Sequence, residues 1–186
     1  DAGRFDEALK GWGRRDVAER GMARAIAKGR SPAEAVRTVS RQMRTFWVSA
    51  LQSSIFNHLL EERLASGTID RLQLGDVAFR HENRKSFLAD AAMMAAEDQQ
   101  ARVDSWEISP AGPIIGPGMP QSTGAVLESE REAFGVAAVE ADDFAKDDLD
   151  FKGTRRPYRV KIRDLELDSG FDEHGTYVRT AFDLPR

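Results

Sequence analysis

The feature that most constrains the fold is a long run of apolar residues at helical spacing. The run covers residues 36–60 and ends at Ser66-Gly67. With its start signals it would exceed thirty residues, which is long for a helix in a globular protein. Because bulky and β-branched side chains follow one another at Thr45, Phe46 and Trp47, we expect a break or kink near residues 44–46.

Start and stop signals define the helices around this run. Ser31, Pro32 and Glu34 have the spacing of a capping box with proline in the first turn. An earlier helix is predicted over residues 17–28 and ends at Gly29.

The period of the apolar residues changes beyond Gly67. We expect a short strand over 72–79 with a turn or bulge at Gly75-Asp76, and a hairpin partner at 86–88. The remaining predicted elements are a helix over 89–103, a strand over 105–109, a Gly/Pro-rich loop over 110–124, a helix over 125–140, strands over 158–163 and 177–184, and a hairpin turn at 170–175. The predicted class is α+β, with N-terminal helices followed by a mixed region with a small antiparallel sheet.

Charge is strongly segregated along the chain. Residues 10–44 contain ten basic and three acidic residues, residues 128–150 contain two basic and nine acidic residues, and residues 152–163 contain six basic and no acidic residues. The formal net charge of −4 therefore hides two basic blocks that flank an acidic one. Such blocks are often only solvated faces, but two basic blocks favour a surface that meets a polyanion on one side.

Several classes of chemistry find no support in the composition. There is no cysteine, and the three histidines lack the spacing of metal ligands. No phosphate-binding glycine loop and no Gly-x-Ser-x-Gly motif occurs. No run approaches the roughly 20 apolar residues of a membrane span. From the residues alone we therefore predict no catalytic constellation and no metal site.

Several short motifs together carry a resemblance to a known family. Residues 46–57 read FWVSALQSSIFN and are followed by Arg63. Residues 75–77 read GDV, and residues 107–116 read EISPAGPIIG. Their order resembles the "QS-x-x-FN" helix and the "GD…ISPTGPxxG" run of the TruD-type tRNA pseudouridine synthases, with Ala111 where threonine is usual.

Two further motifs extend the resemblance toward the end of the sequence. Residues 152–157, KGTRRP, are similar to the family's basic entry to a strand, and residues 177–185, YVRTAFDLP, are similar to its "F-x-LP" strand. The family isomerises the uridine at position thirteen of tRNA without a metal or cofactor. The resemblance therefore implies tRNA as the partner, a monomer, no membrane, and the cytoplasm of a bacterium.

The resemblance also identifies motifs that this chain lacks. The family's catalytic aspartate lies in a "G-x-KDR" motif, and Arg14-Arg15-Asp16 has neither its residue order nor its context. We therefore expect this chain to contain no catalytic residue and to be a piece of a larger enzyme. The expected parts are a helical flank of the catalytic domain over 1–45, the family's insertion (TRUD) domain over 46–176, and a strand returning to the catalytic domain over 177–186.

The residues expected to contact RNA are arginines, because a guanidinium group is always charged and binds phosphate with two hydrogen bonds. These residues are Arg41, Arg44, Arg63, Arg155, Arg156 and Arg159. For Arg63 and Arg155 an internal ion pair is an equally good interpretation.

Other motif residues have a structural or an RNA-binding role. They are Gln52, Ser53, Asn57, Ser109, Pro110 and Gly112. Ser53 and Asn57 lie four residues apart on the predicted helix, where their side chains could anchor the Gly/Pro loop by hydrogen bonds to its backbone.

Two other functions stay open at this point. The chain could be a stand-alone, non-catalytic RNA-binding module. It could also be a protein-interaction domain whose contact surface is the acidic segment 128–150.

Overall fold

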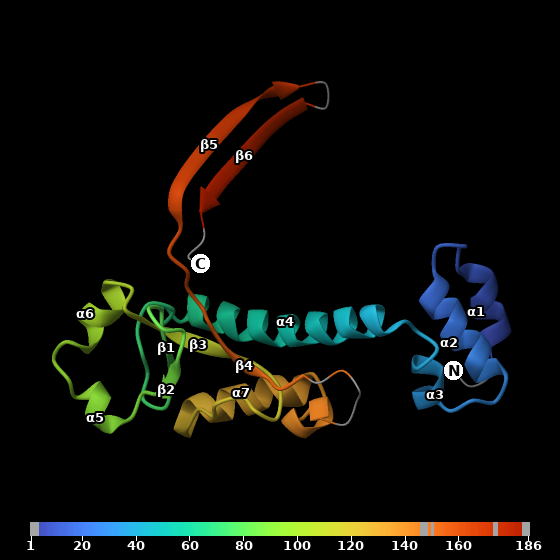
Figure 1. Cartoon of the computed structure of the whole chain (residues 1–186), viewed down its shortest axis with the longest axis horizontal. Coiled ribbons are helices and arrows are strands. Elements are labelled where there is room, and N and C mark those ends of the chain that lie inside the picture. The colour runs from blue at the N-terminus through green and yellow to red at the C-terminus, as the bar shows by residue number, and fades with distance from the viewer. Residues whose placement is uncertain (1–3, 146–148, 150, 173–174, 184–186) are drawn as a thin grey trace. The chain divides into compact units, whose positions relative to one another are not determined.

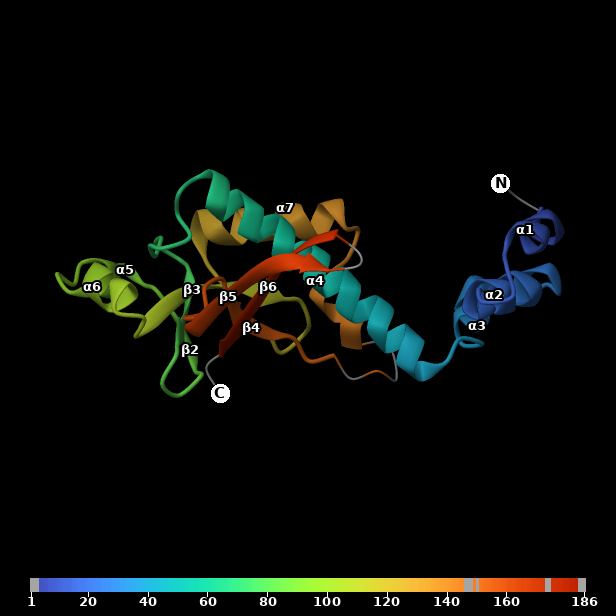
Figure 2. The same ribbon diagram turned by 90° about the horizontal axis from the view of Figure 1, so that it is seen from above.

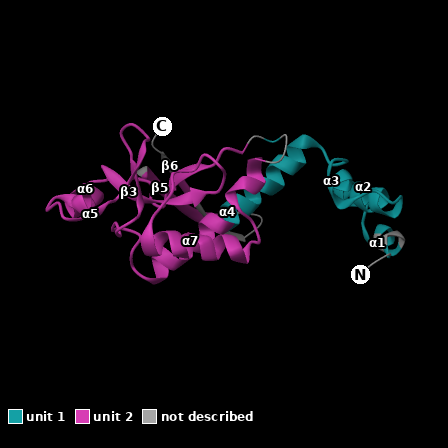
Figure 3. Ribbon diagram, turned by 90° about the horizontal axis from the view of Figure 1, so that it is seen from below, with its two compact units in different colours: residues 1–54, 147–149 teal, residues 55–146, 150–186 magenta. Residues whose placement is uncertain are grey.

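Helices come first, and a small antiparallel sheet follows with further helices around it (Figure 1). This order confirms the predicted α+β class. The computed structural model describes residues 4–145, 149, 151–172 and 175–183. Two compact units are present, residues 1–54 with 147–149 and residues 55–146 with 150–186 (Figure 3). None of the described helices is both long and apolar enough to cross a membrane.

The first unit consists of helices. They are α1 (Phe5–Gly11), α2 (Val17–Ala27), α3 (Pro32–Val36) and the first part of α4 (Arg41–Ala65). The capping box is confirmed, because the Ser31 hydroxyl accepts from the Glu34 backbone N–H while the Glu34 carboxylate accepts from the Ser31 N–H at 2.9 Å.

The break in the long apolar run lies before the predicted position. Helix α3 ends at Val36, and α4 runs without interruption from Arg41 through Thr45, Phe46 and Trp47. Ser40 explains the position, since its hydroxyl accepts a hydrogen bond from the Met43 N–H at 3.3 Å, as an N-cap does. β-Branched and aromatic residues cost only tenths of a kcal/mol each inside a helix, which is too little to break one.

The second unit is built around a four-stranded antiparallel sheet with the order β2-β1-β3-β4. Its strands are β1 (Val77–Arg80), β2 (Ser86–Leu88), β3 (Ile108–Ile114) and β4 (Thr154–Pro157). Strand β3 pairs with β1 on one side and with β4 on the other, and its residues 108–113 are buried. A core cluster packs around Ile108 and contains Leu72, Ala78, Ala89 and Val103.

The start of the predicted Gly/Pro loop is part of the sheet. Strand β3 includes Pro110 and Pro113, so the loop begins only after Ile114. Proline lacks a donor but keeps its acceptor, and the Pro110 carbonyl accepts from the Tyr158 N–H at 3.0 Å. Gly112 is required beside it, because a Cβ there would lie 2.5 Å from the ring of Tyr158.

Several other elements differ in extent from the prediction. The predicted helix over 89–103 is two short helices, α5 (Ala91–Met94) and α6 (Gln99–Asp104). Helix α7 (Gly124–Val136) is followed by the 3₁₀ helix η1 (Ala141–Ala145). The C-terminal half of α4 and helix α7 lie side by side (Figures 1 and 2), and Ser129 Oγ donates to Glu62 Oε2 at 3.0 Å.

The basic segment predicted as a strand over 158–163 connects two strands instead. Residues 158–162 form no ladder, and β5 (Arg163–Asp172) begins after them. Strand β5 pairs with β6 (Gly175–Asp183) in a separate two-stranded sheet, so a hairpin is present, but its first strand is residues 163–172 and not the predicted 158–163. The segment leaves the sheet after Tyr158, whose N–H donates to the Pro110 carbonyl. The side chain of the next residue, Arg159, donates to the Val103 carbonyl.

Gly75 joins three segments of the second unit. Its N–H donates to the Ala89 carbonyl at 2.9 Å, and its carbonyl accepts from the Thr123 N–H at 3.0 Å. Its φ is +91°, and a Cβ would lie 2.2 Å from the carbonyl oxygen of Thr123. Both the backbone angle and the close approach therefore require glycine.

We predict that Gly75→Ala lowers the free energy of unfolding by about 2 kcal/mol or more, because it adds backbone strain and a clash. Gly135→Ala is the matched control: Gly135 lies in α7 and has nothing within 4 Å of the added Cβ. This control should stabilise the protein by about 0.5–1 kcal/mol. Urea denaturation of both variants measures the difference, and equal effects would contradict the role of Gly75.

Candidate functional site

A buried ion pair joins α4 to the turn before β1. The Arg63 guanidinium donates to both carboxylate oxygens of Asp76, at 3.1 Å from Nη1 to Oδ2 and more closely from Nη2 to Oδ1. The Gln73 N–H also donates to Asp76, at 2.7 Å. Burial raises the pKa of Asp76, and the adjacent Arg63 opposes that shift.

A second buried ion pair joins β4 to α7. Both terminal nitrogens of Arg155 donate to the Glu130 carboxylate, at 2.9 Å from Nη2 to Oε2. Arg155 Nε donates to the Pro120 carbonyl at 2.7 Å, and the Ser122 hydroxyl donates to Glu130 at 2.7 Å. The pair therefore holds the Gly/Pro loop as well as the two elements.

Tyr158 lies next to Arg63 in the same unit. The Arg63 guanidinium is 5.7 Å from the centroid of its ring, and the Phe56 ring is 5.2 Å away. Burial raises the pKa of the Tyr158 hydroxyl, so this group stays neutral at physiological pH.

A cleft of about 360 Å³ opens beside these buried pairs. Its walls come from α4, the segment before β1, α7 and the residue that follows β4. The lining residues are Leu59, Glu62, Arg63, Ser66, Thr68, Gln73, Leu74, Ala125, Val126, Ser129, Glu130 and Tyr158. The mixed lining offers hydroxyl, amide and carboxylate groups together with an apolar wall.

The burial of Arg63 and Arg155 corrects their place among the expected RNA contacts. Arg63 is 8% exposed and Arg155 is 3% exposed, and each guanidinium group forms an ion pair with a carboxylate. The structure thus assigns both to the internal role that the sequence left open, and a phosphate would have to displace a buried partner. Sequence reasoning did not identify Asp76, Glu130 or Tyr158, although Asp76 lies in the GDV motif and Glu130 in the acidic helix.

The other motif residues separate into buried and exposed groups. Gln52 is buried on α4, whereas Ser53 and Asn57 are exposed. The expected anchoring of the Gly/Pro loop by Ser53 and Asn57 is therefore wrong, since Arg155 and Ser122 hold that loop instead. The remaining three motif residues lie buried in β3; they are Ser109, Pro110 and Gly112.

Besides Arg63, three arginines of the second unit lie over aromatic rings. Arg80 is 5.5 Å from the ring centroid of Phe87, Arg156 is 5.4 Å from that of Phe56, and Arg159 is 4.2 Å from that of Trp106. Within the part of the chain that the structure describes, neither Arg156 nor Arg159 has a carboxylate partner, whereas the charge of Arg80 acts on Glu107. The charge of Arg156 and Arg159 is therefore available to an anion, unlike that of Arg63 and Arg155.

Arg41 and Arg44 lie in the first turn of α4, in the first unit. Arg41 is exposed and Arg44 is half-buried. They share a helix face, as their three-residue spacing requires.

His81 directly follows β1 and lies close to Trp106 and Arg159. Its Nε2 is hydrogen-bonded to the Ser109 hydroxyl at 2.8 Å, and its ring centroid is 6.4 Å from that of Trp106. Burial lowers the pKa of His81, and the charge of Arg159 lowers it further. Neither His81 nor Trp106 was identified as a candidate from the sequence.

Comparison with known proteins identifies the family. The family model described as tRNA pseudouridine synthase D (TruD) matches residues 1–186. The chain belongs to the TruD family. The members of this family are tRNA pseudouridine synthases, which are isomerases, and the resemblance seen in the motifs is confirmed.

Relatives of this TruD chain are longer than the chain itself. A tRNA pseudouridine synthase D of Syntrophotalea carbinolica is 31% identical over 185 residues, which cover 98% of this chain and 44% of the relative. One of Geobacter sp. (strain M21) is 38% identical over 82% of this chain and 36% of the relative. The chain thus spans less than half the length of these relatives.

A solved structure shares the fold of the TruD chain. The crystal structure of a protein described as a tRNA pseudouridine synthase D from Methanosarcina mazei matches with a TM-score of 0.74 and 22% identity. The match covers 100% of this chain and 45% of that one.

We predict that Glu130→Ala lowers the free energy of unfolding by about 3–5 kcal/mol, because Arg155 is left buried without its carboxylate. Glu107→Ala is the control: it also breaks an arginine pair, that of Glu107 with Arg102, but at the surface. The control should change stability little. Urea denaturation compares the two, and similar losses would contradict a dominant role for the buried pair.

A second prediction concerns pH. Because the folded state lowers the pKa of His81, the unfolded chain binds more protons as pH falls below the ordinary imidazole pKa of about 6.5. The stability that neutral His81 contributes is therefore complete above that value and is lost below it. Unfolding free energies measured between about pH 7 and pH 5 should fall more steeply for the wild type than for His81→Gln. Parallel curves would contradict this.

Proposed function

We propose that this chain is the insertion-domain portion of a tRNA pseudouridine synthase that converts the uridine at position thirteen of tRNA to pseudouridine. Its role there is to contribute contacts to the tRNA, in the cytoplasm. The proposal rests on the family match together with its coverage. The family model matches residues 1–186, and the chain spans less than half the length of the relatives. The enzyme's activity thus belongs to the longer protein.

The proposed RNA contacts are the expected arginines other than the buried Arg63 and Arg155. They are Arg41, Arg44, Arg156 and Arg159. A guanidinium binds phosphate oxygens through two parallel N–H groups, and stacking on an aromatic ring keeps those in-plane N–H groups available. Arg63 and Arg155 are left out of the proposal, because they hold the fold together.

The hairpin of β5 and β6 supports an arrangement within a longer enzyme. We place residues 1–45 with the catalytic domain, residues 46–176 in the insertion domain, and residues 177–186 on the return to the catalytic domain. Strand β5 exposes apolar side chains at alternate positions, with Leu165, Leu167 and Phe171 at 56%, 69% and 85% exposure. Such a face is unfavourable in water, which favours a further protein segment against the hairpin.

We predict that the chain alone forms no pseudouridine, because it lacks the family's "G-x-KDR" aspartate motif. Incubation with unmodified tRNA, followed by mass spectrometry of the nucleosides, measures this directly. A full-length family member under the same conditions is the positive control. Turnover by the 186-residue chain would sink the proposal that it is a non-catalytic portion.

Titration of tRNA against the chain at increasing salt separates the proposal from the protein-interaction alternative. RNA binding through a few arginines must weaken as salt rises, since each phosphate contact releases condensed counterions. Absence of binding at low salt would favour a protein partner for the acidic segment 128–150. A natural gene encoding little beyond these residues would favour the stand-alone RNA-binding module.

A further inference from the structure

Arg159 is held in a fixed orientation by two contacts. Its guanidinium carbon is 4.2 Å from the centroid of the Trp106 ring, and its Nη2 donates to the Val103 carbonyl at 3.2 Å. The ring contact and the hydrogen bond to Val103 together restrict the orientation of the group. Of the five N–H groups of an arginine, one is used by Val103, so an edge with several donors is left.

No carboxylate neutralises Arg159 within the described residues. Glu107, which follows Trp106 in the sequence, is occupied by Arg102, which donates to it from Nε at 3.0 Å and from Nη2 at 2.7 Å. Arg159 therefore differs from Arg63 and Arg155, whose guanidinium groups each hold a buried carboxylate. An oriented arginine without an acidic partner is suited to an anion with two oxygens.

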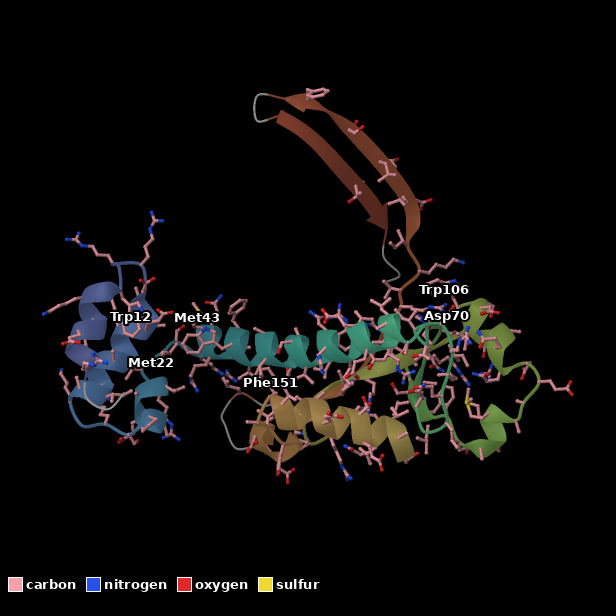
Figure 4. The ribbon with its side chains drawn as sticks, turned by 180° about the vertical axis from the view of Figure 1, so that it is seen from behind. Trp12, Met22, Met43, Asp70, Trp106 and Phe151 are labelled. Atoms are coloured by element: carbon pink, nitrogen blue, oxygen red, sulfur yellow. The ribbon has the colours of Figure 1, made fainter. Side chains whose placement is uncertain are left out.

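Trp106 occupies a backbone position that does not favour it. Its φ is +65°, in the left-handed region where glycine is usual, and its N–H donates to the Val103 carbonyl at 3.1 Å after the end of α6. A glycine would close this turn without strain, so the turn itself does not require an indole. Figure 4 shows Trp106 beside the segment that follows β4, where its ring supports Arg159.

His81 is the third side chain, close to Arg159 and Trp106. Its ring meets that of Trp106 edge to face and is tied to Ser109 at 2.8 Å. The lowered pKa of His81 follows from this burial and from Arg159, so the imidazole is neutral at pH 7 and the positive charge of the cluster belongs to Arg159. The indole of Trp106 therefore contacts the His81 ring and the Arg159 guanidinium.

We propose that Arg159 binds a phosphodiester group of the tRNA, and that Trp106 is the positioning residue that holds the guanidinium in the orientation for two hydrogen bonds to phosphate oxygens. This inference rests on the proposed function, because it assumes tRNA as the partner. It adds to the proposed function the residue that orients the guanidinium, a tryptophan that the family motifs do not include.

The first test compares Arg159→Gln with Arg102→Gln, both in the full 186-residue chain. The two variants lose the same charge, but Arg102 is already paired with Glu107. Arg159→Gln should weaken tRNA binding about tenfold at low salt and reduce the slope of log affinity against log salt by about one contact. Arg102→Gln should leave both nearly unchanged. Equal effects of the two substitutions would overturn the proposal.

The second test separates orientation from charge. Arg159→Lys keeps the charge but loses the planar fork and its stacking, so it should restore the salt slope but not the affinity. Trp106→Gly suits the left-handed backbone and removes the ring, so it should weaken binding several-fold with an unchanged thermal unfolding midpoint. Wild-type affinity in Arg159→Lys or in Trp106→Gly would refute the positioning role of Trp106.

The outcomes also distinguish this inference from the proposed function. If the wild-type chain does not bind tRNA even at low salt, the proposed function fails. If it binds tRNA with a normal salt dependence while Arg159→Gln binds equally well, only the assignment of Arg159 and Trp106 fails.

Discussion

The ion pair between Arg155 and Glu130 is the interaction on which the second unit most depends. It joins a strand of the sheet to α7, and the same guanidinium holds the Gly/Pro loop through the Pro120 carbonyl. Ser122 satisfies a further lone pair of the carboxylate. A buried charge pair is costly unless its hydrogen bonds are complete, and here the bonds that complete it also fix the path of the loop.

The division of the arginines follows from this constraint. Arg155 and Arg63 are enclosed because carboxylates from α7 and from the turn before β1 meet them inside the unit. Arg156 alternates with Arg155 along β4, so its side chain points to the opposite face, where it stacks on Phe56 and stays exposed. Adjacent residues of one basic motif thus serve different purposes, the first in the fold and the second at the surface.

Local signals were predictable from the sequence, whereas long-range partners were not. The capping box at Ser31 and Glu34 involves residues three apart, and it forms as expected. The position of the helix break was missed, because the hydrogen bond that Ser40 Oγ accepts from the Met43 N–H outweighed the weak propensities of residues 45–47. The roles of Arg63 and Arg155 depended on carboxylates 13 and 25 residues away, and periodicity does not reveal such pairing. Strand β3 was cut short in the prediction because proline usually ends a strand, yet Pro110 needs only its carbonyl there.

The same division makes the net charge of −4 compatible with the proposed RNA surface. Each carboxylate that pairs with a buried arginine cancels a charge inside the fold, where it has little effect on the field outside. The arginines that stack on aromatic rings keep their charge at the surface, where it acts over about 10 Å at ordinary salt. Affinity for a phosphate group then depends on how firmly such an arginine is oriented rather than on the sum of charges. In the proposed RNA-binding role, the aromatic rings of Phe56 and Trp106 therefore matter as much as the arginines that they contact.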